Sequence, residues 1–158
     1  MVHRKTKKEI NLQSFYLRES YVDAFSEGLK LQTNLVTLNL SRNQLTSNRL
    51  IKVLFKLPKT LKELILNNNP DLASEAYRVL GEDIIDKPGC KLEKLELEGC
   101  RINDTALRPI VKALEYNTSL KFVNLSRNQI REPGALDIAK MIEVNTTLVV
   151  FFLHWNKL

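Results

Sequence analysis

Three glutamates, Glu93, Glu96 and Glu98, stand close together and are the first candidates for chemistry. On a strand, Glu96 and Glu98 would project from one face about 7 Å apart, because side chains alternate along an extended chain. Paired carboxylates can act as general acid and base. However, the sequence holds neither a P-loop nor a G-x-S-x-G motif beside them. The pattern therefore favours an exposed acidic strip, and we predict no catalytic residue and no enzyme activity.

The histidines and cysteines offer little further chemistry. His3 and His154 stand at opposite ends of the sequence, so we predict no metal site and no cofactor. Cys90 and Cys100 flank a predicted strand that would hold them roughly 20 Å apart at about 3.3 Å per residue. A disulfide needs Cα atoms within about 7 Å. Two unpaired thiols, with no apolar stretch after the charged start of the chain, indicate a cytoplasmic protein.

A repeated motif must position these side chains. Self-similarity at a fixed period predicts a solenoid, in which each repeat buries its apolar face by stacking on its neighbours. The motif is L-x-x-L-x-L-x-x-N, and its five copies are Leu35-Leu38-Leu40-Asn43, Leu61-Leu64-Leu66-Asn69, Leu92-Leu95-Leu97-Cys100, Leu120-Val123-Leu125-Asn128 and Leu148-Phe151-Leu153-Asn156.

Each repeat divides into a strand and a helix. The alternating leucines point inward from a strand, and the asparagine at the ninth position should satisfy buried backbone groups in a ladder along the stack. Beyond it, apolar or small residues recur every fourth position, which is helical spacing. The three sets are Leu72, Ala76, Leu80 and Ile84; Ile102, Ala106, Ile110 and Leu114; and Ile130, Gly134, Ile138 and Ile142.

Several local details follow from this frame. The small second residue of each set should let the helix approach the strand layer. Ser74 and Asp104 are predicted N-caps, and Pro109 should delay or bend its helix. Arg49 stands where other repeats have a small residue, so that helix should use Leu50 and Leu54 instead.

A degenerate repeat precedes the five copies. Ile10 and Leu12 match the strand leucines, and Phe15 replaces the ladder asparagine, as suits a terminal repeat. Its helix should bury one residue in four, namely Leu17, Tyr21, Phe25 and Leu29. Between later repeats, Asn117 is interpreted as an ordinary surface residue.

Repeat length narrows the class. Successive motif starts at Leu92, Leu120 and Leu148 are 28 residues apart, which leaves room for a full helix. From about Ile10 to Leu158 the chain resembles the ribonuclease-inhibitor type of leucine-rich repeat protein. The resemblance implies an α/β horseshoe segment with parallel strands on the concave face and helices on the convex face. We therefore expect a basic N-terminal arm at residues 1–9 and a repeat domain at residues 10–158, its last repeat incomplete.

The concave face carries the predicted binding residues. By alternation, Phe122, Val150 and Phe152 should form an exposed apolar anchor, with a polar rim of Lys94, Glu96, Glu98 and His154. Aromatic anchors with charged rims are typical of protein–protein interfaces. The alternative is that further repeats, or another subunit, cover this end of the stack.

The charge balance does not single out a nucleic-acid or membrane ligand. Net charge is +6, and part of the excess is a run from Arg4 to Lys8 without aromatics among the basic residues. Stacking platforms for single-stranded nucleic acid need such aromatics, and no apolar run reaches the length of a membrane helix. We thus predict a non-enzymatic binding module or scaffold with a protein partner.

Two other functions remain open. One is a structural subunit of a cytoskeletal or ciliary assembly. The other, which the family resemblance alone implies, is a GTPase activator; it would need a positioned arginine near the strand-to-helix loops, where Arg42, Arg101 and Arg127 are available.

Overall fold

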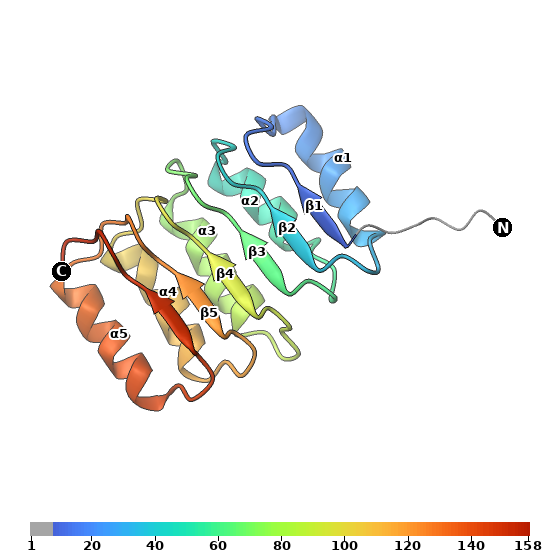
Figure 1. The fold of residues 1–158 in the computed structure, drawn as a ribbon. Coiled ribbons are helices and arrows are strands. Elements are labelled where there is room, and N and C mark those ends of the chain that lie inside the picture. The colour runs from blue at the N-terminus through green and yellow to red at the C-terminus, as the bar shows by residue number, and fades with distance from the viewer. Residues whose placement is uncertain (1–7) are drawn as a thin grey trace.

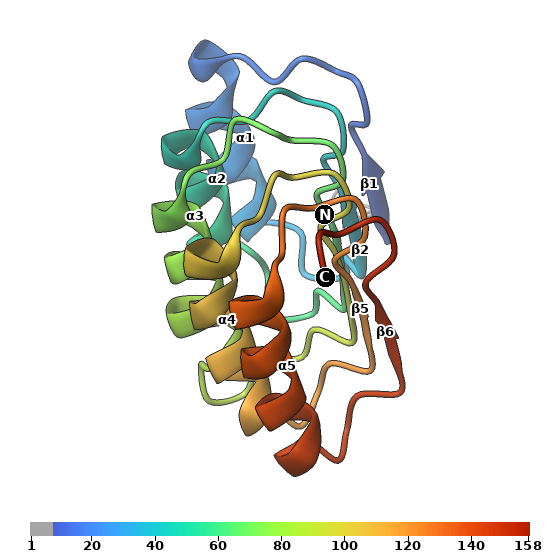
Figure 2. The same ribbon diagram turned by 90° about the vertical axis from the view of Figure 1, so that its left-hand side faces the viewer.

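The protein is a two-layer stack of strand–helix units. The computed structural model describes residues 8–158; residues 1–7, most of the predicted basic arm, lie outside that part. Helices cover one face of a single parallel sheet, and the other face is open (Figures 1 and 2). The strands, in sheet order, are β1 (Glu9–Asn11), β2 (Thr37–Asn39), β3 (Glu63–Ile65), β4 (Lys94–Glu96), β5 (Phe122–Asn124) and β6 (Val150–Phe152). The predicted α/β solenoid is confirmed.

The helical layer contains one helical segment after each of the first five strands. A π-helical segment, η1, continues α3 without a break in the repeat that carries the longest insertion. The segments are α1 (Glu19–Lys30), α2 (Ser47–Leu54), α3 (Ser74–Val79), η1 (Leu80–Ile85), α4 (Asp104–Glu115) and α5 (Glu132–Val144).

The core lies between the two layers and follows the leucine frame. The central residue of each strand pairs in register with its counterpart next door, as Leu64 does with Leu38 and with Leu95. All three are fully buried. In α2, Leu50 and Leu54 are buried and Arg49 is not, which confirms the shifted register of that helix.

The asparagine ladder forms as predicted. Asn128 Oδ1 accepts hydrogen bonds from the backbone N–H groups of Cys100 and Ile102, each at 3.0 Å. Its Nδ2 donates to three carbonyls, those of Leu97, Leu125 and Ser126. One buried amide therefore joins two successive repeats. Its loss would leave backbone groups of both repeats without hydrogen-bond partners.

Cys100 takes the ladder position in β4's repeat with weaker chemistry. Its Sγ lies 3.3 Å from the Leu66 carbonyl oxygen, and its own carbonyl accepts a hydrogen bond from Tyr77 Oη at 3.0 Å. The thiol is fully buried, and burial raises its pKa from 9.0 to about 11. Burial also raises the pKa of the Tyr77 hydroxyl, so both groups are held in their neutral forms.

The interpretation of Asn117 as an ordinary surface residue is wrong. Asn117 is buried; its Oδ1 accepts from the N–H groups of Ser119 and Leu120, and its Nδ2 donates to the Ile85 carbonyl of the preceding repeat. Asn145 repeats the arrangement one unit later by donating to the Leu114 carbonyl. A second set of asparagine contacts thus joins repeats at the helix-to-strand turns.

Neither predicted N-cap residue caps the helix that was expected. Ser74 is the first residue of α3, not its cap, and Asn103 caps α4 by accepting from the Ala106 N–H at 3.0 Å. Asp104 Oδ1 instead accepts from the N–H groups of Arg131 and Gly134, at the start of α5. Each carboxylate or amide can accept more than one donor, so caps here also join neighbouring repeats.

Gly134 is small for a reason other than the predicted one. A Cβ there would lie 2.5 Å from Asp104 Oδ1 and 3.0 Å from Leu107 Cδ2, both in α4's repeat, and 2.8 Å from Ile130 Cγ2 of its own repeat. The small residue therefore admits the neighbouring helix, not the strand layer. A Cβ on Gly81 would likewise lie 2.5 Å from the Pro109 carbonyl oxygen of α4. α4 begins at Asp104, so Pro109 does not delay it.

Two predicted core positions are exposed. Tyr21 of α1 and Ile142 of α5 face solvent, and their places are taken by Val22 and Met141. α1 is the first helix of the stack and α5 is the last. A strict four-residue rule drifts around a helix of 3.6 residues per turn, so neighbouring residues take over its inner face.

Candidate protein-binding face of the sheet

The open face of the sheet holds all seven residues predicted to bind a partner. They lie on β4, β5 and β6 or directly after them. The register aligns Lys94, Phe122 and Val150 in one row across the three strands. Glu96, Asn124 and Phe152 form the next row.

The predicted apolar anchor is a real cluster. Phe122 and Phe152 meet edge to face, with ring centroids 5.4 Å apart and planes at 83°. The His154 ring lies 5.1 Å from that of Phe152, which brings this predicted rim residue into the anchor. Phe122 and Val150 are half-buried, while Phe152 is 38% exposed. The cluster therefore combines fixed geometry with accessible apolar surface.

Lys94 and Glu96 form the charged border of this anchor. Lys94 Nζ lies 2.6 Å from Glu96 Oε1 and 5.2 Å from the centre of the Phe122 ring. Both side chains are partly buried, Lys94 at 34% and Glu96 at 17% exposure. The Glu96 carboxylate holds the ammonium over an aromatic face, where cation and ring attract.

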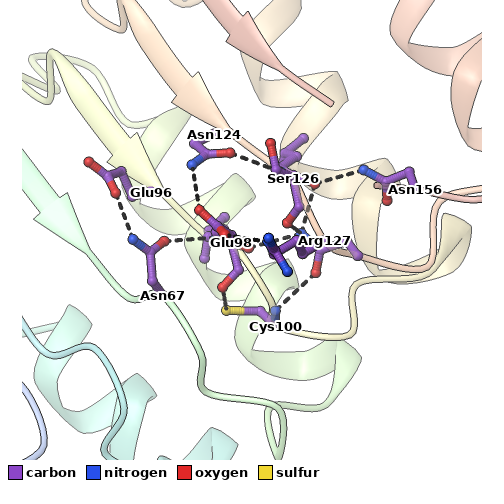
Figure 3. Close-up of polar contacts among 11 residues, drawn as sticks. Asn67, Glu96, Glu98, Cys100, Asn124, Ser126, Arg127 and Asn156 are labelled. Atoms are coloured by element: carbon purple, nitrogen blue, oxygen red, sulfur yellow. Dashed lines mark hydrogen bonds and ion pairs between the residues drawn. The ribbon is translucent and has the colours of Figure 1, made fainter. Parts of the chain in front are cut away.

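Glu98 belongs to a polar network that joins the charged border of the anchor through Asn67. Its Oε2 accepts a hydrogen bond from Asn124 Nδ2 at 3.2 Å, and its Oε1 pairs with Arg127 Nε at 3.0 Å (Figure 3). Asn67 Oδ1 accepts from the Glu98 backbone N–H, while Asn67 Nδ2 donates to Glu96 Oε2 at 2.6 Å. Asn67 therefore links the two acidic residues across β3 and β4.

Trp155 is a further surface residue, which strand alternation does not predict. Its ring is 77% exposed and lies 5.8 Å from the Arg127 guanidinium carbon. Both residues have left-handed backbone, with φ of 58° and 56°. Each immediately precedes a ladder asparagine, so its side chain leaves the strand face at the turn. The position directly before a ladder asparagine is the sequence feature that could have indicated this exposure.

The arginines at the strand-to-helix turns are not equivalent. All three are exposed and have left-handed backbone, but only Arg127 pairs with Glu98 and lies over Trp155. Within residues 8–158, Arg42 and Arg101 take part in no ion pair. This part of the chain also contains no group of three His, Cys, Asp or Glu side chains placed to hold a metal ion. Nor does it contain a helix long and apolar enough to span a membrane.

Known proteins share this repeat. Family models described as leucine rich repeat match residues 34–57, 90–111 and 116–139. Ribonuclease inhibitor of Sus scrofa is 35% identical over 131 residues, which cover 80% of this chain. This is a leucine-rich repeat protein of the ribonuclease-inhibitor type. The Mus musculus ribonuclease inhibitor is 32% identical over 129 residues. The chain spans 28% of the length of either inhibitor.

Proteins with other names also match. Capping protein, Arp2/3 and myosin-I linker protein 3 of Rattus norvegicus is 29% identical over 145 residues, covering 88% of this chain and 10% of that protein. Among solved structures, the tropomodulin C-terminal domain of Caenorhabditis elegans superimposes with a TM-score of 0.65 at 14% identity. That likeness covers 88% of this chain and 84% of the other and concerns the fold alone.

Proposed function

We propose that this leucine-rich repeat protein binds a protein partner through the open, concave face of its sheet. The observation that carries the proposal is the Phe122–Phe152 pair on solvent-facing strand positions. Large apolar side chains on an open sheet face are matched by a partner that covers them, and aromatic anchors dominate the energy of such interfaces. We propose that Lys94, Glu96, Glu98 and His154 set orientation around Phe122, Val150 and Phe152 and that no catalysis is involved.

Charge and geometry suggest how the partner would be recognised. The Lys94–Glu96 pair borders the rings, and the Glu98–Arg127 pair lies at the turn beside Trp155. A partner that inserts an apolar side chain beside Phe152 would meet both signs of charge within a short distance. Complementary rim charges raise association rates and select partners more than they add affinity.

A second candidate is a structural subunit of a cytoskeletal assembly. Its support is the similarity to the capping protein, Arp2/3 and myosin-I linker protein, a match that covers 88% of this chain. In the last repeat, Leu148, Phe151 and Leu153 are half-buried, whereas the matching leucines of the preceding repeats are buried. Further repeats or another subunit would cover this edge. A cytoplasmic location remains a prediction.

The GTPase-activator hypothesis requires a positioned arginine that is not already held in an ion pair. Arg127 is engaged by Glu98, which leaves Arg42 and Arg101 as candidates. Single-turnover GTP hydrolysis with small GTPases tests it: no acceleration by the wild-type protein rejects the hypothesis, and acceleration lost in Arg101→Ala or Arg42→Ala would support it.

Site-specific photo-crosslinking tests the location of binding. A benzophenone amino acid is placed at His154, beside the aromatic pair, and separately at Leu136, which is exposed on α5 of the helical face. We expect one discrete adduct in cells from position 154 that disappears when Phe152→Ala is added. Adducts from position 136 alone would place the interface on the helices and reject the sheet-face proposal.

A further inference from the structure

A groove unrelated to the sheet face lies at the helix-to-strand turns. The segment between η1 and β4, visible in Figure 1 before the start of β4, carries the inserted loop of the 31-residue repeat. Together with the turn between α2 and β3 it encloses a hollow of about 400 Å³. A second hollow of about 350 Å³ shares Phe55, Leu57, Pro58 and Lys59 with the first. The second hollow is also lined by Lys30 and Thr33 of the preceding turn, so it lies between a different pair of turns. We call the first hollow, between the α2–β3 turn and the inserted loop, the turn groove.

The floor of the turn groove is apolar. Phe55 is 57% exposed there, and Pro58 and Pro88 lie on the two loops that border it. Gly89 adopts a φ of +82°, a left-handed conformation that side-chain-bearing residues rarely adopt. The two prolines restrict the backbone of the loops on either side of the hollow. Its volume suits one or two bulky side chains, at the lower end of the roughly 300–1,000 Å³ found for ligand sites.

The rim of the turn groove is basic. Lys59, Lys87 and Lys91 line it, and within residues 8–158 none of the three takes part in an ion pair. By contrast, Lys56, which lines the second hollow, pairs with Glu27. The inserted loop, residues 86–90, contributes a single carboxylate, Asp86, which lines the hollow on the other side of the loop. Three ammonium groups without ion-pair partners around an apolar floor favour a ligand that is negatively charged.

We propose that the turn groove binds an acidic segment of a partner protein, one that places one or two bulky apolar side chains against Phe55 and the two prolines. Its carboxylates lie over Lys59, Lys87 and Lys91. A protein segment fits better than an anionic membrane, because part of the apolar surface is recessed between loops where a flat bilayer cannot reach it. This second surface is independent of the sheet face.

The groove contains its own reporter. Cys90 lies in its lining and is half-buried, so reagents reach its thiol. The other cysteine, Cys100, is fully buried with its pKa raised to about 11. Since the thiolate is the reactive form, iodoacetamide near pH 8 should modify Cys90 selectively in the folded protein. A ligand in the groove would slow that reaction.

The test measures Cys90 alkylation by mass spectrometry with a synthetic peptide of two leucines between two triplets of glutamate. We expect saturable protection. The double variant Lys87→Glu, Lys91→Glu should raise the half-protecting concentration by about tenfold, whereas Lys140→Glu on α5 should not change it. Each variant is compared with its own rate without peptide, because nearby charges alter the thiol itself.

Three control results would overturn the proposal. An unchanged rate with the acidic peptide means that the groove does not take such a segment. Equal protection by a peptide with serines in place of the leucines means that the floor has no part in binding. Protection by phosphatidylserine vesicles, but not by the peptide, would assign the groove to a lipid surface instead.

Discussion

Phe122 and Phe152 lie on adjacent parallel strands and meet edge to face, one row apart, with centroids 5.4 Å from each other. The contact is diagonal: Phe122 pairs in register with Val150, and Phe152 with Asn124. A diagonal contact of this kind fixes ring orientation without burying the rings, because long side chains reach across a sheet to the next row. The surface that we propose for a partner therefore presents two rings in a defined mutual orientation.

The ring contact should be measurable as a coupling energy. Phe122→Ala and Phe152→Ala, alone and together, should show a coupling of about 0.5–1.5 kcal/mol in urea unfolding, the usual value for edge-to-face pairs. Combining Phe122→Ala with Leu136→Ala on α5 should give additive effects, because the two side chains lie on opposite layers. Additivity in the first cycle would show that the rings do not interact.

The ladder predicts a large penalty at Asn128. Asn128→Ala should lower the free energy of unfolding by about 1–3 kcal/mol, because it leaves buried N–H and carbonyl groups of two repeats without partners. The exposed neighbour Gln129 provides the matched control, and Gln129→Ala should cost less than about 0.5 kcal/mol. Equal shifts in the urea midpoint would mean that the amide is dispensable.

Asn117 should behave like a ladder residue. Asn117→Ala removes four hydrogen bonds at the turn before β5, including the one to the Ile85 carbonyl, and should also cost about 1–3 kcal/mol. Thr118, its exposed neighbour, serves as control, with an expected cost below about 0.5 kcal/mol. A near-zero effect at Asn117 would restore its interpretation as a simple surface residue.

The buried thiol of Cys100 should make the folded protein less stable at alkaline pH. Its pKa is raised by burial to about 11 in the folded chain from an ordinary 9.0, so the folded state holds the thiol proton more tightly. This contribution is complete below pH 9 and is lost as pH rises toward 11. The difference in unfolding free energy between wild type and Cys100→Ala should therefore shrink from pH 8 to pH 10.5, and a constant difference would contradict the assignment.

Most of the fold was predictable because one repeat motif determines both which leucines are buried and which asparagines bond to the backbone. Leu38, Leu64 and Leu95 are buried because strand alternation leaves them no other face. Asn43, Asn69 and Asn128 make the bonds expected of them because a strand that turns inward must satisfy its backbone. Agreement between periodicity, polar satisfaction and spacing gives a single answer.

What the sequence did not show depends on contacts between repeats. Asp104 caps the following helix rather than its own, and Asn117 reaches back to Ile85; neither relation follows from a pattern within one repeat. At the candidate site, alternation correctly predicted the outward face of Phe122 and Phe152. It did not find Trp155, because a left-handed turn residue leaves the period-two frame.

The central claim is that a partner covers the aromatic pair, and a titration tests it most directly. The partner identified by crosslinking at position 154 is titrated against wild type, Phe152→Ala and Leu136→Ala, each with a melting curve. Loss of an aromatic anchor commonly costs 2 kcal/mol or more, so Phe152→Ala should raise Kd about thirtyfold while remaining folded, and Leu136→Ala should leave Kd unchanged. If folded Phe152→Ala binds as wild type does, or if Leu136→Ala is the weaker binder, the sheet face is not the binding surface.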